Sequence, residues 1–353
     1  MHIVADIGTS TMRVGVIGRK EYISEPNVVA RMPSGEMVVG REAFDIIGRS
    51  PAGVDVFFPI EGGVIRNLDA AVASLQHSVA QFKQNRFGAK FELTIAAPSG
   101  LTGVEKRALE ETGYLAGAKK VETFESVVAA AIGTGLPIGE PSGCLLVNLG
   151  AGVTEVAVLS MGGIVESRFL RSGGRSLDKN IVESVRKEYG FAIGMRSAEV
   201  LKQSCATERE QSEFEVRGRN LLSGLPGTLK VPRKLVDDIL ETYYQALIEL
   251  IVHTIEQSPP ELAGDIMDRG IVLAGGGAHE GSAVPALMAA TAVPAFVADN
   301  PDTATIRGLL QYQDSVRGAG VGNRIGRFPS LGKVTDLPTK LKSVSNLFQS
   351  DRV

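Results

Sequence analysis

The sequence predicts an α/β protein made of two similar halves, each large enough to bury its own core. Three observations support this fold class. The chain has 353 residues, and a domain averages roughly 150 residues. Short β-branched runs alternate with helical patterns, as they do in α/β proteins. A hairpin of strand, glycine turn and strand occurs at the start of the chain, and a second one occurs in the middle.

The period of the apolar residues predicts the individual elements. Apolar and β-branched runs predict strands at His2–Asp6, Met12–Ile17, Phe91–Ala96, Cys144–Asn148, Glu155–Ser160, Gly163–Phe169 and Gly270–Leu273. Helical spacing predicts helices at Leu68–Lys83, Gly103–Ala116, Ser126–Gly133, Ser176–Tyr189, Ser197–Ser204 and Pro232–Gln257. The second half therefore repeats the plan of the first.

Composition excludes several classes of protein. Hydrophobic residues make up 44% of the chain and charged residues 22%, which is typical of a folded protein. Lys and Arg number 37 against 40 Asp and Glu, so the net charge of −3 gives no field that attracts nucleic acid. The two cysteines and four histidines lack the spacing of metal ligands. The N-terminus resembles no secretion signal, and no apolar run is long enough to cross a bilayer, so we expect a cytoplasmic protein.

Three glycine loops follow predicted strands and are candidates for binding phosphate. They are Gly8, Thr9 and Ser10, then Gly150, Ala151 and Gly152, and finally Gly275, Gly276 and Gly277. Glycine permits a positive φ and lets backbone N–H groups approach an anion. A tight turn without a ligand is the alternative for any single loop. As a set, the loops predict a nucleotide held from two sides. A Rossmann fingerprint fits less well, because the first loop leads into a strand.

Asp6 ends the first predicted strand, directly before the first glycine loop. A carboxylate beside phosphates is costly unless a cation compensates its charge. Magnesium, held largely through water, is the natural cation for this place. The alternative is an aspartate that only caps its own turn. We expect the magnesium role.

The loops belong to a long series of segments in a fixed order. The series is ADIGTS, SEPNVVA, VGREAFDIIGRSP, PIEGGVI, APSGLTGVEKRALEETGYLAGA, AAAIGTGLP, NLGAGVTEVAVLSMGGIV, GGRSLDKNI, IGMRSAEVLK, VRGRNLLSGLP, SPPELAGDIMDRGIVLAGGGA and TAVPAFVADNP. From Met1 to about Leu310 it resembles the actin-like ATPases, and within them the MreB-type cell-shape actins. The resemblance implies a duplicated, ribonuclease H-like fold of two domains. It also implies that ATP or ADP with Mg²⁺ binds in the central cleft and that subunits stack into filaments.

The resemblance also implies domain boundaries. The first domain is expected at residues 1–139 with a small subdomain at about 30–95, and the second at 140–314 with a small subdomain at about 178–245. A basic tail follows at 315–353. Its residues Leu337, Leu341, Val344, Leu347 and Phe348 have helical spacing, so a short helix there could contact a lipid surface or a partner. A solvated tail is the alternative.

Further binding residues are implied by the resemblance. Glu199 and Lys202 match family positions that reach the ribose and the adenine, and their i, i+3 spacing places them on one helix face. A solvated ion pair is the alternative. Arg175 stands where the family often has an aspartate. It could neutralise phosphate charge, or it could be an ordinary surface arginine.

Three positions depart from the pattern of the family. Asn148 replaces an aspartate that helps position magnesium and the attacking water, Val153 replaces a threonine near that water, and Ser126 replaces the glutamate that polarises it. Losing a single such group costs about 10²–10³ in rate. We therefore expect a very slow ATPase or none, with binding through backbone amides retained. Glu125 or Glu155 could substitute as the base, but alternation is expected to turn their side chains away.

One further segment relates to membranes. Phe87 lies among basic residues where the resemblance places a membrane-inserting loop, and core packing of its ring is the alternative.

We interpret the chain as a filament-forming scaffold for cell shape or for positioning an internal structure. Its partners would be other copies of itself, a membrane surface and membrane proteins, with no nucleic acid. Two alternatives stay open: a small-molecule kinase of the same fold, and a monomeric adaptor that binds nucleotide structurally. No aspartate suited to activating a sugar hydroxyl follows the second loop, which counts against the kinase.

Overall fold

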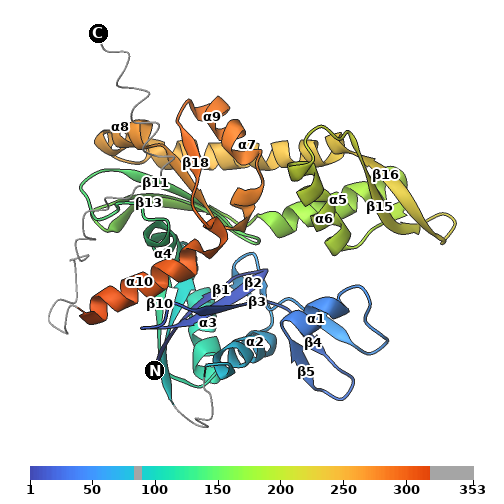
Figure 1. Cartoon of the computed structure of the whole chain (residues 1–353), viewed down its shortest axis with the longest axis horizontal. Coiled ribbons are helices and arrows are strands. Elements are labelled where there is room, and N and C mark those ends of the chain that lie inside the picture. The colour runs from blue at the N-terminus through green and yellow to red at the C-terminus, as the bar shows by residue number, and fades with distance from the viewer. Residues whose placement is uncertain (83–89, 319–353) are drawn as a thin grey trace.

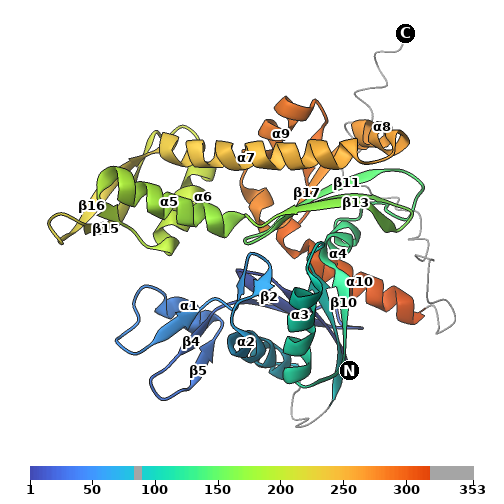
Figure 2. The same cartoon turned by 180° about the vertical axis from the view of Figure 1, so that it is seen from behind.

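The structure is a computed structural model that describes residues 1–82 and 90–318, with side chains to Gln313. Phe87 and the helix expected within the tail lie outside the described residues. We refer to residues 1–139 as the first half and to residues 140–318 as the second half. Their main sheets lie one above the other in Figure 1, and Figure 2 shows the same arrangement from behind. Among the described helices, none is long and apolar enough to span a membrane.

Each half contains a five-stranded sheet, and the two sheets have the same strand order. The first sheet is β3 (Tyr22–Pro26), β2 (Thr11–Val16), β1 (His2–Ile7), β9 (Phe91–Ala97) and β10 (Ala118–Glu125). The second is β13 (Gly163–Leu170), β12 (Thr154–Ser160), β11 (Cys144–Leu149), β17 (Ile271–Ala274) and β18 (Ala295–Val297). In both sheets the first three strands are antiparallel and the last two pair in parallel. The repeat seen in the sequence is thus a repeat of topology.

Each half also contains a three-stranded sheet and its own helices, and the first half has a further two-stranded sheet, β7–β8. The first half adds β4 (Val29–Arg31), β5 (Met37–Val39), β6 (Asp55–Phe57), β7 (Ile60–Glu61) and β8 (Val64–Ile65), with α1 (Arg41–Ile46), α2 (Leu68–Ala80), α3 (Gly103–Leu115) and α4 (Ser126–Gly133). The second adds β14 (Phe191–Ala192), β15 (Glu213–Asn220) and β16 (Pro226–Pro232), with α5 (Gly174–Tyr189), α6 (Met195–Thr207), α7 (Arg233–Glu256), α8 (Pro260–Arg269), α9 (Ala283–Thr291) and α10 (Ala304–Gly318). Two short 3₁₀ turns, η1 (Gly276–His279) and η2 (Pro301–Thr303), follow β17 and β18.

Local sequence explains where these elements form. All six residues of β11 are apolar or amide side chains, and five of them are buried, as expected for a strand in the middle of a covered sheet. Helix α3 begins at a capping box, in which the Thr102 hydroxyl accepts from the Glu105 N–H and the Glu105 carboxylate accepts from the Thr102 N–H. Helix α5 ends at Gly190, which has a left-handed conformation.

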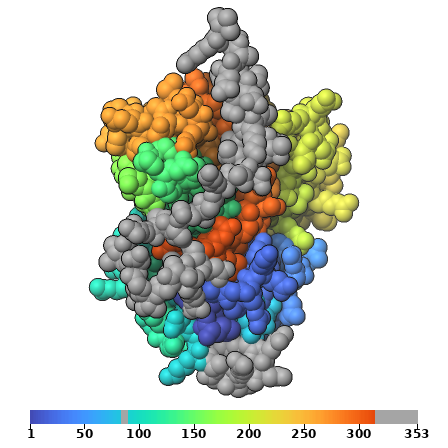
Figure 3. Space-filling view, turned by 60° about the vertical axis from the view of Figure 1, so that its left-hand side comes forward, coloured from blue at the N-terminus to red at the C-terminus, as the bar shows by residue number. Residues whose placement is uncertain are grey.

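Helices α4 and α10 cross between the two halves. Figure 3 shows α10, in orange-red, at the surface between the blue N-terminal strands and the second half. Every residue of α4 is buried. The two helices meet at Gly133 and Gly308, where an added Cβ on either glycine would overlap the backbone of the other helix. Apolar residues of α10, Ile306 and Leu309, also join Val4 of β1 in one cluster. The last helix therefore ties the second half to the first.

The glycine crossing gives a testable prediction. Gly308→Ala is expected to lower the free energy of unfolding by about 1–3 kcal/mol, because the added methyl forces two helix backbones apart. Gly264→Ala is the matched control, since Gly264 lies in α8 with open space around its Cα. That change is expected to stabilise the protein by up to about 1 kcal/mol through helix propensity. Urea unfolding of both variants checks this, and equal stability of the two would contradict it.

Candidate functional site

The first two glycine loops have the same geometry. Gly8 donates its N–H to the Thr11 carbonyl oxygen at 3.1 Å, and Gly150 donates to the Val153 carbonyl oxygen at 3.0 Å. A Cβ on Gly8 would lie 2.7 Å from the Thr11 oxygen, and a Cβ on Gly150 would lie 2.5 Å from the Val153 oxygen. Both turns are therefore too tight for a side chain at the glycine.

All three loops converge on one place. A Cβ on Gly152 would overlap the Thr9 side chain, so the second loop directly faces the first across the two halves. Gly275 has φ of 83° and lies against the Leu149 backbone, where a Cβ would also come 2.8 Å from Asn148 Oδ1. The loops that the sequence predicts to surround a ligand are thus brought together around the second hairpin.

Asp6 lies at the base of the first hairpin, next to an arginine. Arg13, its cross-strand partner, places Nη1 3.8 Å from Asp6 Oδ2 and Nη2 3.3 Å from Asp302 Oδ2 in the second half. Burial raises the pKa of the Asp6 carboxyl, the charge of Arg13 opposes this, and the charge of Glu155 adds to it. Sequence reasoning missed Arg13, although its position opposite Asp6 follows from hairpin register.

The donor set bears on the expected magnesium ion. Within the described residues, no group of three or more His, Cys, Asp or Glu side chains could hold a metal. Asp6 is a single carboxylate that already faces a guanidinium group. These residues fit a magnesium ion that is bound mainly by phosphate oxygens and water, with Asp6 acting through water. They do not fit a metal held by the protein alone.

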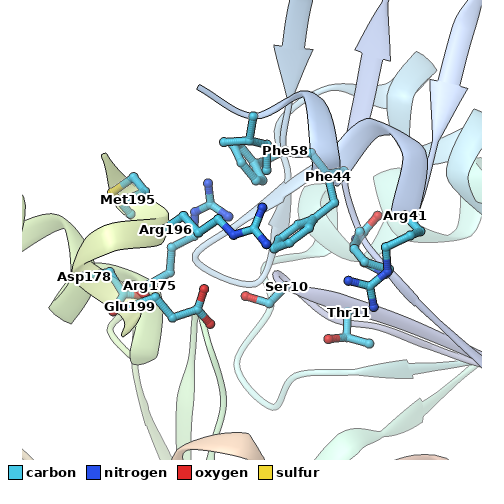
Figure 4. Close-up of a pocket in the computed structure, with 14 residues that line it drawn as sticks. Ser10, Thr11, Arg41, Phe44, Phe58, Arg175, Asp178, Met195, Arg196 and Glu199 are labelled. Atoms are coloured by element: carbon cyan, nitrogen blue, oxygen red, sulfur yellow. The ribbon is translucent and has the colours of Figure 1, made fainter. Parts of the chain in front are cut away.

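A cavity of about 250 Å³ opens beside the loops, between α1 of the first half and helices α5 and α6 of the second (Figure 4). Ser10 and Thr11 line it from the first hairpin, and Glu199 lines it from α6. In the wall of this cavity, Arg175 of the second half lies over the ring of Phe58 of the first half. The guanidinium carbon is 3.3 Å from the ring centroid. Burial lowers the pKa of Arg175. Arg175 is therefore stacked against an aromatic ring across the mouth of the cleft.

Two further contacts lie beside this cavity. Arg196, at the start of α6, lies over the Phe44 ring of α1 at 5.2 Å. Lys202 is buried, and its Nζ lies 2.5 Å from Asp178 Oδ1 and donates to the Gly174 carbonyl oxygen at 2.8 Å. Glu199 and Lys202 therefore have different places in the structure. Glu199 lines the cavity, whereas Lys202 holds the start of α5 through Asp178 and the Gly174 carbonyl.

A second cavity of about 200 Å³ lies on the far side of α6, beside the segment that follows the third loop. Arg209, Asp237 and Glu280 line it. Burial raises the pKa of the Cys205 thiol in its wall to about 11, so this thiol is not a reactive nucleophile at neutral pH. No motif in the sequence indicates this cavity.

Two of the three positions that depart from the hydrolytic pattern, Ser126 and Asn148, donate to Glu155. Ser126 Oγ donates to Glu155 Oε2 at 2.5 Å, and Asn148 Nδ2 donates to the same oxygen at 3.3 Å. The backbone N–H and the hydroxyl of Ser99 donate to Oε1 at 2.8 Å and 3.0 Å. Burial raises the pKa of Glu155, while these four donors lower it. Sequence reasoning missed Ser99 entirely.

The expectation that Glu155 is turned away is wrong. Asn148 and Glu155 are cross-strand partners, and Val153 and Glu155 are two residues apart, so their side chains lie on the same face of the sheet. The side chain of Glu155 therefore points toward these positions and not away from them. Glu125, by contrast, lies exposed at the start of α4. Each Glu155 oxygen already accepts two hydrogen bonds, which is the full capacity of a carboxylate. Glu155 therefore has no free lone pair with which to act as a base in this arrangement.

Comparison with known proteins explains this architecture. The family model described as MreB/Mbl protein matches residues 1–319. The chain belongs to the MreB/Mbl family. This MreB/Mbl chain is 37% identical over 313 residues to the cell shape-determining protein MreB of Escherichia coli K12, covering 86% of this chain and 90% of the relative. It is 35% identical over 301 residues to the cell shape-determining protein Mbl of Bacillus subtilis 168, covering 84% and 90%.

Solved structures agree. MreB5 of Spiroplasma citri bound to ADP superimposes with a TM-score of 0.83 at 28% identity, covering 90% of this chain and 97% of that one. The same protein bound to AMPPNP gives a TM-score of 0.83 at 29% identity. The MamK double helical filament gives a TM-score of 0.73 at 19% identity, which bears on the fold alone. The predicted actin-like α/β fold and the resemblance to MreB-type actins are thereby confirmed.

Proposed function

We propose that this MreB/Mbl chain binds ATP or ADP in the central cleft, assembles with copies of itself into filaments, and acts as a scaffold for cell shape or for positioning an internal structure. The observation that carries the proposal is the convergence of three glycine loops from both halves. The nucleotide bound in the related MreB5 structures and the names of the curated relatives support it.

We assign the phosphates to the backbone N–H groups of the first two loops. The two loops face each other across the halves at Thr9 and Gly152, so N–H groups from both halves can hold one triphosphate. Magnesium would neutralise phosphate charge, with Asp6 orienting its water. Glu199 lies at the cavity wall, where it can accept from ribose hydroxyls, and the third loop is assigned to the adenosine side. Lys202 supports the site by holding Asp178 and the Gly174 carbonyl.

We propose that hydrolysis is weak or absent. Phosphoryl transfer to water depends on groups that position and polarise the water. Asn148 and Val153 carry no charge and no hydroxyl, and Ser126 is engaged with Glu155. Glu155 itself is saturated by its four donors. None of the side chains at these positions is therefore available to activate water.

Localisation and membrane contact also belong to the proposal. We place the protein in the cytoplasm, in line with relatives that are named as cell shape-determining proteins. Contact with a membrane surface or a membrane protein would involve Phe87 and the basic tail.

Assembly can be tested at the tip of the β15–β16 hairpin. Leu222 and Leu225 are 96% and 65% exposed there. Asn220 Oδ1 accepts from the N–H groups of Leu222 and Ser223, which holds the turn in one shape. The hairpin lies at one end of the second half, and α8 lies at the opposite end (Figures 1 and 2). A head-to-tail contact between opposite ends of two copies extends into a filament when its rotation does not close a ring.

Leu222→Glu is therefore expected to raise the critical concentration for assembly at least about tenfold, because it places a charge in an apolar contact. Leu222→Met is the matched control and should assemble as the unmodified chain does. Sedimentation with ATP, together with negative-stain electron microscopy, measures both. A chain that stays monomeric at every concentration would instead favour the adaptor.

A further inference from the structure

The two halves meet along a continuous strip of contacts beneath the candidate nucleotide site, and we define this strip as the seam. From the first half it includes the Gly62–Gly63 turn, Ser99, Gly100, Glu105 and Ser126. From the second half it includes Val153, Glu155, Phe169 and Arg171. The residues of the second half come from β12, β13 and the positions directly before β12 and directly after β13. Those of the first half come from four separate segments.

Glu155 is the buried centre of the seam. Its side chain is 3% exposed. Three of its four donors, the Ser99 N–H, the Ser99 hydroxyl and the Ser126 hydroxyl, come from the first half, and the fourth, Asn148, comes from its own half. A buried carboxylate is costly unless donors satisfy it, so separating the halves would leave both oxygens short of partners. The carboxylate therefore favours the closed arrangement.

Close packing surrounds this polar centre. Gly63 has φ of 78°, and a Cβ there would lie 2.5 Å from Val153 Cγ2 and 3.5 Å from Pro98 Cγ. Gly100 has φ of 88°, and a Cβ there would overlap the Phe169 ring. Both glycines bring the backbone of the first half directly against side chains of the second. Val153, which lacks the hydroxyl of the hydrolytic pattern, is thus one of the packing residues of the seam.

The outer edge of the seam is polar and more exposed. Arg171 donates to Glu105 Oε1 at 2.9 Å and to the Gly62 carbonyl oxygen at 3.0 Å. The side chains of Arg171 and Glu105 are 38% and 25% exposed. Exposed ion pairs contribute little. The binding strength of the seam therefore lies in Glu155 and its packed surroundings.

We propose that Glu155 is a positioning residue that locks the two halves together, and that Ser126, Asn148 and Val153 serve this lock in place of hydrolysis. A serine hydroxyl at position 126 donates to Glu155, whereas a carboxylate at the same place would repel it. The lock keeps the cleft closed and so slows the release of a bound nucleotide. The part that concerns nucleotide release rests on the function proposed above.

Glu155→Gln tests the lock, because it keeps the size of the side chain but turns one acceptor oxygen into a donor that faces other donors. Hydrogen exchange is measured on the nucleotide-free chain, at the peptides that contain Ser99 and Ser126. Release of a fluorescent ATP analogue is measured by chase with unlabelled ATP. We expect exchange at both peptides to become at least tenfold faster, and release to become at least tenfold faster.

Two variants serve as controls. Glu166→Gln removes a carboxylate that pairs with Arg168 inside β13 at 3.2 Å, away from the seam, and should change neither quantity. Glu105→Gln weakens the ion pair at the outer edge and leaves an amide oxygen that can still accept from the Thr102 N–H of the capping box. It should change release by less than about threefold, as expected for an exposed pair. If Glu155→Gln does not fold, the double variant Ser99→Ala with Ser126→Ala removes both hydroxyl donors to Glu155 and is measured in its place.

The outcomes separate the lock from nucleotide binding. Faster exchange together with faster release supports both the lock and the proposed nucleotide binding. Faster exchange in a chain that binds no nucleotide supports the lock and overturns the function proposed above. Unchanged exchange at both peptides in a folded variant overturns the lock, whatever the nucleotide does.

Discussion

Restoring the hydrolytic side chains together, as Ser126→Glu, Asn148→Asp and Val153→Thr, is expected to raise the rate of ATP hydrolysis at least about 10²-fold. Each such group contributes about 10²–10³ to a rate of this kind. Contributions within one catalytic unit do not add, so the gain from all three is expected to be smaller than their product. The glutamate at position 126 would also repel Glu155 and loosen the seam, which admits the water that hydrolysis needs.

Ser126→Glu alone is the informative comparison. It breaks the hydrogen bond to Glu155 but restores neither the aspartate nor the threonine, so it is expected to gain far less than the triple variant. Phosphate release per bound nucleotide, at saturating ATP and Mg²⁺, measures both. A triple variant that binds ATP and still releases no phosphate would show that the missing groups are not what limits hydrolysis.

Gly275→Ala is expected to weaken nucleotide binding by about 10- to 100-fold. Its φ of 83° suits glycine, and an added Cβ would overlap the Leu149 backbone and approach Asn148 Oδ1. Strain of this kind costs about 1–3 kcal/mol, which corresponds to roughly 5- to 150-fold in affinity and brackets the expected range. Because the third loop rests on the second hairpin, relieving the overlap displaces both loops from the arrangement that receives the nucleotide.

Titration with a fluorescent nucleotide measures this effect, and Gly264→Ala again provides the matched substitution in open space. Circular dichroism of the nucleotide-free variants checks that both are folded. If Gly275→Ala binds nucleotide as tightly as Gly264→Ala does, the third loop is not part of the binding site.

Elements whose signal is local could be predicted from the sequence. Helix α4 begins and ends at the residues that its pattern predicts, and α7 (Arg233–Glu256) lies within one residue of its predicted range at each end. Both hairpins could be predicted because a glycine turn between two apolar strands needs no distant partner. That the glycine loops meet could also be predicted, because the sequence indicated the same order of elements in both halves.

Some elements carried a local signal that was not used. Helix α8 starts with proline at its first position, a typical start signal. Strand β15 alternates buried Phe214 and Val216 with exposed Glu213, Glu215 and Arg217, which is the pattern of a half-buried strand. The segments at Pro260–Arg269 and Glu213–Asn220 could therefore have been predicted.

Other features depend on tertiary packing and had no local signal. Helix α10 is fixed by its crossing with α4 at Gly133 and Gly308, which are far apart in sequence. The role of Glu155 depends on Ser99 and Ser126, which donate hydrogen bonds to it from the other half of the molecule. Reasoning along one strand could place the face of Glu155, but it could not identify the donors that occupy it.

The central claim is that this cleft holds ATP through backbone donors, supports assembly, and lacks the side chains that cut the nucleotide. It is tested most directly by measuring phosphate release and filament formation in one sample of the purified full chain with ATP and Mg²⁺. The account predicts bound nucleotide and filaments in the electron microscope, with phosphate released at least about 10²-fold more slowly than by a relative that carries all three groups. Phosphate release as fast as that relative, or no binding of ATP, would contradict it.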